Sequence, residues 1–173
     1  MAVIDIIKEK AKADKKTIVL PESMDRRTWE AAEKILKEGL ANLIIIGTPE
    51  DIGEHSKGLD VSGATIINPQ TYEKTQEYID LFVELRKSKG MTPEKAKETI
   101  LGDYDLLWLF MIKNGDADGM VSGACHSTAN TLRPCLQVIK TKPGQAGSAF
   151  FLMEVPDCDL GDNWYICIRL TVV

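Results

Sequence analysis

The residue types best suited to chemistry lie in one segment, residues 122–134, with the sequence Ser-Gly-Ala-Cys-His-Ser-Thr-Ala-Asn-Thr-Leu-Arg-Pro. A small residue such as Gly123 lets an anion approach the backbone, and the free amides at a helix start would face that anion. Ser127 and Thr128 add hydroxyl donors, and the guanidinium of Arg133 can hold two phosphate oxygens at once. The segment therefore predicts an oxyanion site. A capped helix with a surface arginine has the same pattern and stays open as the structural alternative.

Cys125 and His126 are adjacent and could be read as a nucleophile and its base. Adjacent residues on an extended turn point in different directions, and the sequence identifies no partner that would orient the histidine. We therefore do not expect cysteine catalysis. A hydrolase that uses Cys125 or Cys158 is the weakest alternative function, and alkylation of the two thiols would test it.

The four cysteines form no Cys-x-x-Cys pair, and no histidine lies at zinc-ligand spacing from them. We therefore expect no metal site and, without a secretion signal, reduced thiols. Cys158 follows an apolar stretch in a polar turn, where a cysteine can line a ligand cleft or simply fill space. The cysteines are Cys125, Cys135, Cys158 and Cys167.

Two other charged segments have structural explanations of their own. Residues 84–90 end a helix with cations, where the helix dipole favours them, so Arg86 needs no functional role. Residues 21–27 lie at the end of a predicted strand, and acids and arginines often pair in such a turn. A salt-bridged turn is therefore expected there in preference to catalysis.

Short apolar runs alternate with amphipathic segments, which is typical of strands that alternate with helices. Strands are predicted at residues 17–20, 43–47, 64–69, 117–121 and 148–155. Helices are predicted at residues 3–14 and 25–39, from Thr48, before Gly90, from Thr92, and at 106–112 and 127–139. This alternation predicts βαβ crossovers and a three-layer α/β/α sandwich with a mostly parallel sheet.

Ligands of parallel sheets bind beyond the carboxyl ends of the strands. In this chain that rule selects four segments, residues 21–27, 47–51, 122–133 and 156–161. The candidate anion segment is one of them.

Composition excludes several classes of protein. The chain has 173 residues, 44% of them hydrophobic, with 21 basic and 26 acidic side chains and a net charge of −5. A negative chain is not a general nucleic-acid binder. No apolar run approaches the roughly 18 residues that span a bilayer, and the first residues do not resemble a secretion signal. We expect a cytoplasmic protein without nucleic-acid or membrane partners.

Five segments of the chain occur in the same order in one enzyme family. They are Val19–Glu22 with Asp25 and Arg27, Glu84–Lys87 with Lys89–Gly90, Val121–Ala124, Thr131–Pro134 with Ile139–Gly144, and Val155–Cys158. Five segments in register are hard to reconcile with chance. Over roughly residues 3–163 the chain resembles the amino-terminal half of the phosphate acetyltransferases, or phosphotransacetylases.

The resemblance implies an acyltransferase of acetate metabolism that interconverts acetyl-CoA plus phosphate with acetyl phosphate plus CoA. It implies a fold like that of isocitrate and isopropylmalate dehydrogenases, incomplete in this chain, with the active site between two α/β domains. Arg86 and Arg133 match arginines that serve the active site. Ser127, Thr128 and Arg133 match phosphate-side groups, and Cys158 matches a cysteine near the site that is not a nucleophile. No bound cofactor or metal is implied, coenzyme A is a substrate, and the family's full-length form is expected to be a homodimer.

Length limits the resemblance. Family members are roughly twice as long, and their catalytic base, an aspartate, lies near the far carboxyl terminus. We therefore expect residues 1–145 to form a first α/β domain that lacks its returning carboxyl-terminal segment, and residues 146–163 to begin a second domain. Residues 164–173 are expected to be an aberrant, β-prone tail that aggregates if unpaired. A frameshift or premature stop would explain this pattern, and sequencing of the coding DNA would decide it.

Three functional interpretations remain. The first is a phosphate acetyltransferase, present here in a truncated form. The second is another phosphate acyltransferase, such as the butyryl type, although residues 131–134 and 140–144 favour acetyl. The third is a non-catalytic fragment that binds phosphate or acetyl phosphate.

Overall fold

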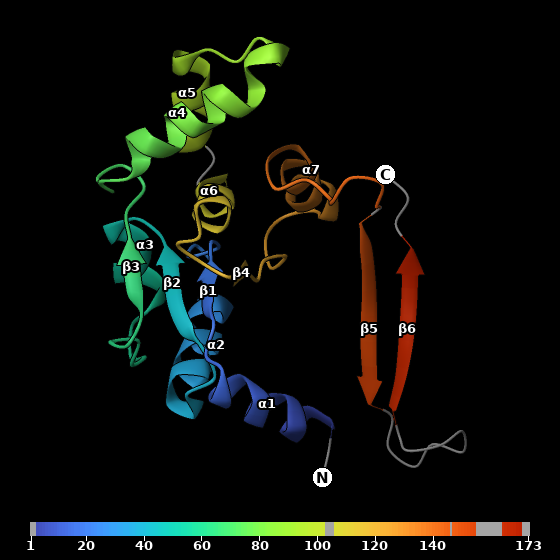
Figure 1. Ribbon diagram of the computed structural model, residues 1–173. Helices are drawn as coiled ribbons and strands as arrows, with labels where there is room; N and C mark the ends of the chain where they lie inside the picture. Colours follow the sequence, from blue (N-terminus) through green and yellow to red (C-terminus); the bar gives the residue numbers. More distant parts are fainter. Residues whose placement is uncertain (1–2, 103–105, 146, 155–163, 171–173) are drawn as a thin grey trace. The chain divides into compact units, whose positions relative to one another are not determined.

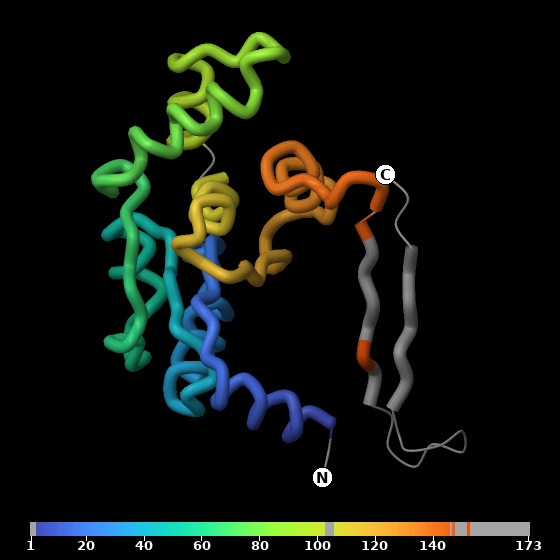
Figure 2. The backbone as a smooth tube through the Cα atoms, viewed as in Figure 1, coloured from blue at the N-terminus to red at the C-terminus, as the bar shows by residue number. Residues whose placement is uncertain are grey.

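The computed structural model describes residues 3–102, 106–145, 147–154 and 164–170. The chain divides into two compact units, Ala11–Ile139 and the pair of segments Met1–Lys10 and Lys140–Val173. We call these the sheet unit and the hairpin unit. The path of the backbone through each can be followed in Figure 2.

The described elements follow the predicted alternation of helices and strands (Figure 1). In chain order they are α1 (Val3–Ala13), β1 (Thr17–Leu20), α2 (Arg26–Glu38), β2 (Asn42–Ile46), α3 (Pro49–His55), β3 (Thr65–Ile67), α4 (Thr75–Arg86), the 3₁₀ helix η1 (Lys87–Lys89), α5 (Pro93–Gly102), α6 (Leu107–Asn114), β4 (Gly119–Met120), α7 (Thr128–Val138), β5 (Ser148–Glu154) and β6 (Trp164–Leu170).

Strands β1 to β4 form a sheet of order β3-β2-β1-β4 in which each neighbouring pair is parallel. Val19 at its centre is in register with Ile44 of β2 and Met120 of β4. Parallel neighbours need crossover helices between them, and α2, α3 and the α4–α6 segment fill that place. The predicted α/β fold with a mostly parallel sheet is confirmed.

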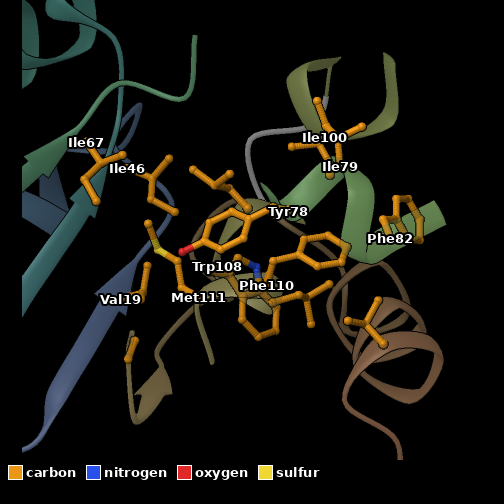
Figure 3. Close-up of a cluster of buried hydrophobic side chains, with 14 of the residues drawn as sticks. Val19, Ile46, Ile67, Tyr78, Ile79, Phe82, Ile100, Trp108, Phe110 and Met111 are labelled. Atoms are coloured by element: carbon orange, nitrogen blue, oxygen red, sulfur yellow. The ribbon is translucent and has the colours of Figure 1, made fainter. Parts of the chain in front are cut away.

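The two faces of the sheet bury different side chains, because successive residues of a strand point to opposite faces. Along β2, Leu43 and Ile45 pack in a cluster with Trp29 of α2. Ile44 and Ile46 pack in a second cluster with helices α4 to α7. Figure 3 shows this second cluster, where Val19, Ile46 and Ile67 of the strands lie with Tyr78, Phe110 and Met111 of the helices. Helices on both faces make this a three-layer sandwich.

The helix boundaries follow local chemistry. The Asp25 side chain accepts a hydrogen bond from the Arg27 amide at the start of α2, and Gly39 ends that helix at a φ of 67°. At the start of α3, Thr48 and Asp51 form a reciprocal capping box. These are the helix starts that the sequence predicted.

One predicted strand is shorter in the structure, and one strand occurs in a segment that was expected to be a tail. The strand expected at 117–121 is reduced to Gly119–Met120, although the Asp118 amide still donates to the Thr17 carbonyl and the Val121 amide to the Val19 carbonyl. In the hairpin unit, the backbone of β6 pairs antiparallel with that of β5, from Ser148 opposite Leu170 to Glu154 opposite Trp164. Most of the segment expected to be a tail is therefore hydrogen-bonded backbone.

No helix in the described part of the chain combines the length and the apolar character that a membrane span requires.

Candidate functional site

Three of the four segments that the sequence selected meet at the carboxyl edge of the sheet. Residues 21–27 follow β1, residues 47–51 follow β2, and residues 122–126 follow β4. The Ser23 hydroxyl donates to Asp51 Oδ2 at 3.5 Å, and Glu22 binds the segment after β4. The fourth segment, residues 156–161, lies outside the described residues, and so does Cys158.

Glu22 is the centre of this arrangement, because its carboxylate accepts hydrogen bonds from four consecutive amides. Oε2 accepts from Gly123 at 2.9 Å and from Ala124 at 2.8 Å. Oε1 accepts from Cys125 at 2.8 Å and from His126 at 3.2 Å. The loop after β4 is therefore wrapped around an internal carboxylate.

His126 adds its side chain to this contact, with Nδ1 at 2.9 Å from Glu22 Oε1. An ionised carboxylate only accepts hydrogen bonds, so Nδ1 carries the proton and donates it. The side chain of Glu22 is only 3% exposed. Burial by itself would raise the pKa of its carboxyl, but the donors from Cys125, His126, Ala124 and Gly123 together lower that pKa to about 2.

This arrangement corrects two points of the sequence interpretation. Gly123 and Ala124 were expected to let a ligand anion approach the backbone, but the carboxylate that binds their amides belongs to Glu22 of the chain itself. His126 was said to lack an orienting partner, and Glu22 is that partner. The signal available in the sequence was an acidic residue just beyond an apolar strand, after Pro21, but its partners lie about one hundred residues away.

A second set of contacts joins the same two loops. Arg27 pairs with Asp25 at 2.5 Å and donates to the Ala124 carbonyl at 3.2 Å. Hydrogen bonds from the Arg27 side chain and amide lower the pKa of Asp25. The salt-bridged turn predicted for residues 21–27 is confirmed.

Cys125 is a free cysteine whose Sγ lies 3.6 Å from Asp25 Oδ2. Burial and the neighbouring Asp25 carboxylate raise the pKa of its thiol, which disfavours the thiolate. A cysteine nucleophile needs the opposite shift. The environment therefore agrees with the expectation that Cys125 does not act as a nucleophile.

Helix α7 carries three of the predicted site residues directly beyond the loop. Ser127 is its N-cap, and the Ser127 hydroxyl accepts a hydrogen bond from the Asn130 amide at 3.3 Å. Thr128 begins the helix, and Arg133 follows in its second turn. All three residues are exposed. The segment is therefore a capped helix with exposed polar side chains. This arrangement fits both the oxyanion site and the purely structural capped helix that the sequence left open.

Arg86 ends α4, as the cation-rich helix end predicted. Among the residues that the structure describes, its Nε is a buried nitrogen without a hydrogen-bond partner. A buried donor without a partner is costly and calls for a ligand or an acceptor. Helices α4 and α7 both pack against the cluster that contains α6, through Phe82 and Val138 respectively. The structure thus places Arg86 and Arg133 on two helices that share one core.

Two small cavities lie beside the loop. One of about 220 Å³ is lined by Leu20, Glu22, Arg27, Thr28, Ala31, Val121, Ser122 and Ala124. One of about 20 Å³ is lined by Leu106, Trp108, Ser122, His126, Asn130, Thr131 and Pro134. A larger cavity of about 610 Å³, lined by parts of β1 to β3 and by Asp116, includes none of the predicted site residues. Within the described residues, no cluster of three or more His, Cys, Asp or Glu could hold a metal ion.

The fold and the loop define a class: three-layer α/β proteins whose polar groups gather at the carboxyl edge of a parallel sheet. Comparison with known families identifies the group within that class. The family model for phosphate acetyl/butaryl transferases matches residues 2–166. The chain belongs to this family.

The similar proteins carry the corresponding names. A phosphate acetyltransferase of Thermoanaerobacterium thermosaccharolyticum is 51% identical over 164 residues, which is 94% of this chain and 50% of that protein. The phosphate acetyltransferase of Acetivibrio thermocellus is 48% identical, with 94% and 49% covered. A phosphotransacetylase crystal structure from Streptococcus pyogenes superposes with a TM-score of 0.84 at 36% identity, with 96% and 51% covered. The chain spans about half the length of the relatives it matches.

Proposed function

We propose that this chain provides the phosphate side of a phosphate acetyltransferase site, for reversible transfer of an acetyl group between CoA and phosphate. The observation that carries the proposal is the 48–51% identity, over 94% of this chain, to proteins named phosphate acetyltransferase. The matched part includes the loop after β4 and helix α7.

In this proposal Ser127, Thr128 and Arg133 bind the phosphate group, and the exposed start of α7 supports this assignment. Arg86 and Arg133 are the proposed catalytic arginines. The buried Nε of Arg86, which lacks a partner among the described residues, supports a role in binding an oxygen of the substrate. Cys158 is proposed to line the substrate site.

The chemistry is a direct acyl transfer. The sulfur of the CoA thiolate attacks the acetyl carbonyl of acetyl phosphate, and a C–S bond forms as the bond between that carbon and the phosphate oxygen breaks. The oxygen keeps the electron pair and leaves in inorganic phosphate. The arginines stabilise the negative charge that develops on the carbonyl and leaving oxygens. The thiol proton needs a base, which the resemblance assigns to an aspartate beyond the matched half.

The remaining expectations form part of the same proposal. Residues 1–145 are a first α/β domain, residues 146–163 begin a second, and residues 164–173 are a tail that differs from the family pattern. The complete enzyme is a homodimer in the cytoplasm, with acetyl phosphate, phosphate and CoA as its small-molecule partners. CoA is a substrate, and no bound cofactor or metal is required.

Calorimetry and a turnover assay test the function together. Titration of inorganic phosphate and of acetyl phosphate into this chain should give saturable binding that Arg133→Ala weakens and the control Lys113→Ala does not. Lys113 is an exposed cation at the end of α6. Acetyl-CoA formation should be measured for this chain and a full-length relative, with butyryl phosphate as the competing acyl donor.

Two results would contradict the proposal. Folded chain that binds neither phosphate nor acetyl phosphate would remove the phosphate-side site. A full-length relative that prefers butyryl phosphate would remove the choice of the acetyl group.

A further inference from the structure

The buried carboxylate of Glu22 takes all of its described hydrogen bonds from the loop after β4. A carboxylate with a 3% exposed side chain binds four successive amides and a ring nitrogen. Carboxylates at this depth are normally paired with a cation. Here backbone dipoles and the His126 donor compensate the charge. The Glu22 carboxylate thus accepts hydrogen bonds from the loop amides, as a bound phosphate does from the amides of a phosphate-binding loop.

Besides Glu22, the loop is held by the hydrogen bond from Arg27 to the Ala124 carbonyl and by the contact of Cys125 with Asp25. Gly123, Ala124 and Cys125 are exposed, so apolar packing contributes little to holding them. Gly123 has a φ of 118°, a conformation that L side chains rarely adopt. The amides of this exposed turn point inward to Glu22, and that carboxylate holds the turn in place.

The anchored residues end where the proposed phosphate site begins. His126 is held to Glu22 through both its amide and its ring, and the next residue, Ser127, is the N-cap of α7. Since the peptide units up to residue 126 are tied down, the direction in which α7 starts is set. Thr128 and Arg133 take their positions from that start.

The occupied amides also decide where a substrate anion can bind. Four N–H groups that would otherwise attract phosphate are already bonded to Glu22, so they are not available to a ligand. An incoming anion is left with the hydroxyls and the guanidinium of α7.

We propose that Glu22 is a positioning residue for the phosphate site: by holding residues 123–126 it orients Ser127, Thr128 and Arg133 and excludes phosphate from the loop amides. This role rests on the proposed function. In this proposal the effect of Glu22 passes through the loop, because both of its carboxylate oxygens are bonded to the loop.

The test measures the dissociation constant of inorganic phosphate for this chain and for Glu22→Gln. The glutamine is nearly isosteric, but its NH₂ group would face backbone donors in place of one carboxylate oxygen. Glu30→Gln is the matched control, because Glu30 is an exposed glutamate of α2 whose carboxylate pairs with Arg26 at 3.1 Å. Circular dichroism verifies that each variant is folded.

We expect Glu22→Gln to weaken phosphate binding at least ten-fold and to speed hydrogen exchange of the amides of residues 123–126. Glu30→Gln should change neither quantity. Faster exchange with an unchanged dissociation constant would overturn the positioning role and leave the phosphate site intact. An unaltered chain that binds no phosphate would overturn the proposed function, and the positioning role with it.

A second variant keeps the test decisive if Glu22→Gln does not fold. Gly123→Ala leaves Glu22 in place and meets no atom within 4 Å, but it strains the turn at a φ of 118°. Gly58→Ala is the control, with a φ of 79° and open space around it, far from the loop in sequence. We expect ten-fold weaker phosphate binding for Gly123→Ala and none of this loss for Gly58→Ala. Equal binding by both variants would overturn the proposal.

Discussion

Glu22 should contribute to the loss of this protein's stability in acid. The pKa of its carboxyl falls from an ordinary 4.5 to about 2 in the folded chain. A carboxyl whose folded pKa lies below its unfolded pKa stabilises the fold above the unfolded value, and this stability is lost as the pH falls through the folded value. The loss is therefore expected between about pH 5 and pH 2.

The size of the effect follows from the shift. A difference of about 2.5 pKa units at about 1.4 kcal/mol per unit corresponds to roughly 3 kcal/mol of unfolding free energy. Solvent screening does not reduce this figure much, because the side chain is only 3% exposed. For a domain of ordinary stability, of about 5–15 kcal/mol, such a loss is a large fraction.

Urea unfolding at several pH values between 7 and 2 measures the effect. Trp29 is a suitable fluorescent reporter, since it is fully buried and its Nε1 donates to the Ser23 carbonyl at 2.7 Å, next to Glu22. The unfolding free energy of the unaltered chain should fall by roughly 3 kcal/mol more over this range than that of Glu22→Gln. Other carboxyls titrate in both proteins and cancel in the difference.

An exposed glutamate provides the control for this measurement. Glu30→Gln should keep the full acid dependence, because an exposed ion pair contributes less than about 1 kcal/mol. Equal slopes of stability against pH for the unaltered chain and Glu22→Gln would contradict this prediction. That result would mean that the four amides do not hold an ionised carboxylate.

Three further predictions concern other parts of the sheet unit. Asp116→Asn should lower the unfolding free energy by about 1–3 kcal/mol. The Asp116 carboxylate accepts hydrogen bonds from the Tyr78 hydroxyl at 2.7 Å and from Lys74. These donors outweigh the effect of burial and lower the pKa of Asp116. Gly47→Ala should lower the melting temperature, since the new Cβ would clash with the Ser23 hydroxyl. Iodoacetamide should modify Cys125 slowly at pH 7 and faster at higher pH, because its thiol pKa is raised.

Each of these has a control and a contrary result. Asp60→Asn, at an exposed aspartate, should change stability far less than Asp116→Asn. Gly53→Ala, where nothing lies within 4 Å of the new Cβ, should be tolerated, and equal melting temperatures for both glycine variants would contradict the predicted clash. Fast alkylation at pH 7, with a rate independent of pH, would show that Cys125 is already a thiolate.

The fold could be predicted from sequence because its signals are local. The apolar run at residues 43–46 predicts a buried strand, and the caps at Asp25 and Thr48 predict helix starts, since each depends on residues within one turn. The two-residue length of β4 could not be predicted. β4 pairs only with Ile18 and Val19 of the four-residue strand β1, and the apolar character of residues 117–121 does not reveal that limit.

The site was predictable only in outline. The rule that ligands bind at the carboxyl ends of strands selected four segments, and three of them meet in the structure. The role of Glu22 was missed because it joins residues about one hundred positions apart, and a sequence pattern of one loop carries no sign of the other. For Arg86, the cation-rich helix end predicts its position in the chain's secondary structure. The burial of its Nε depends on the packing of distant residues, and only the structure reveals it.

The phosphate site at the start of α7 is the central claim, and calorimetric titration of inorganic phosphate into the folded chain and its Arg133→Ala variant tests it most directly. We expect saturable binding to the unaltered chain and binding at least ten-fold weaker to Arg133→Ala. Equal affinities for the two proteins, or no binding to either, would contradict it.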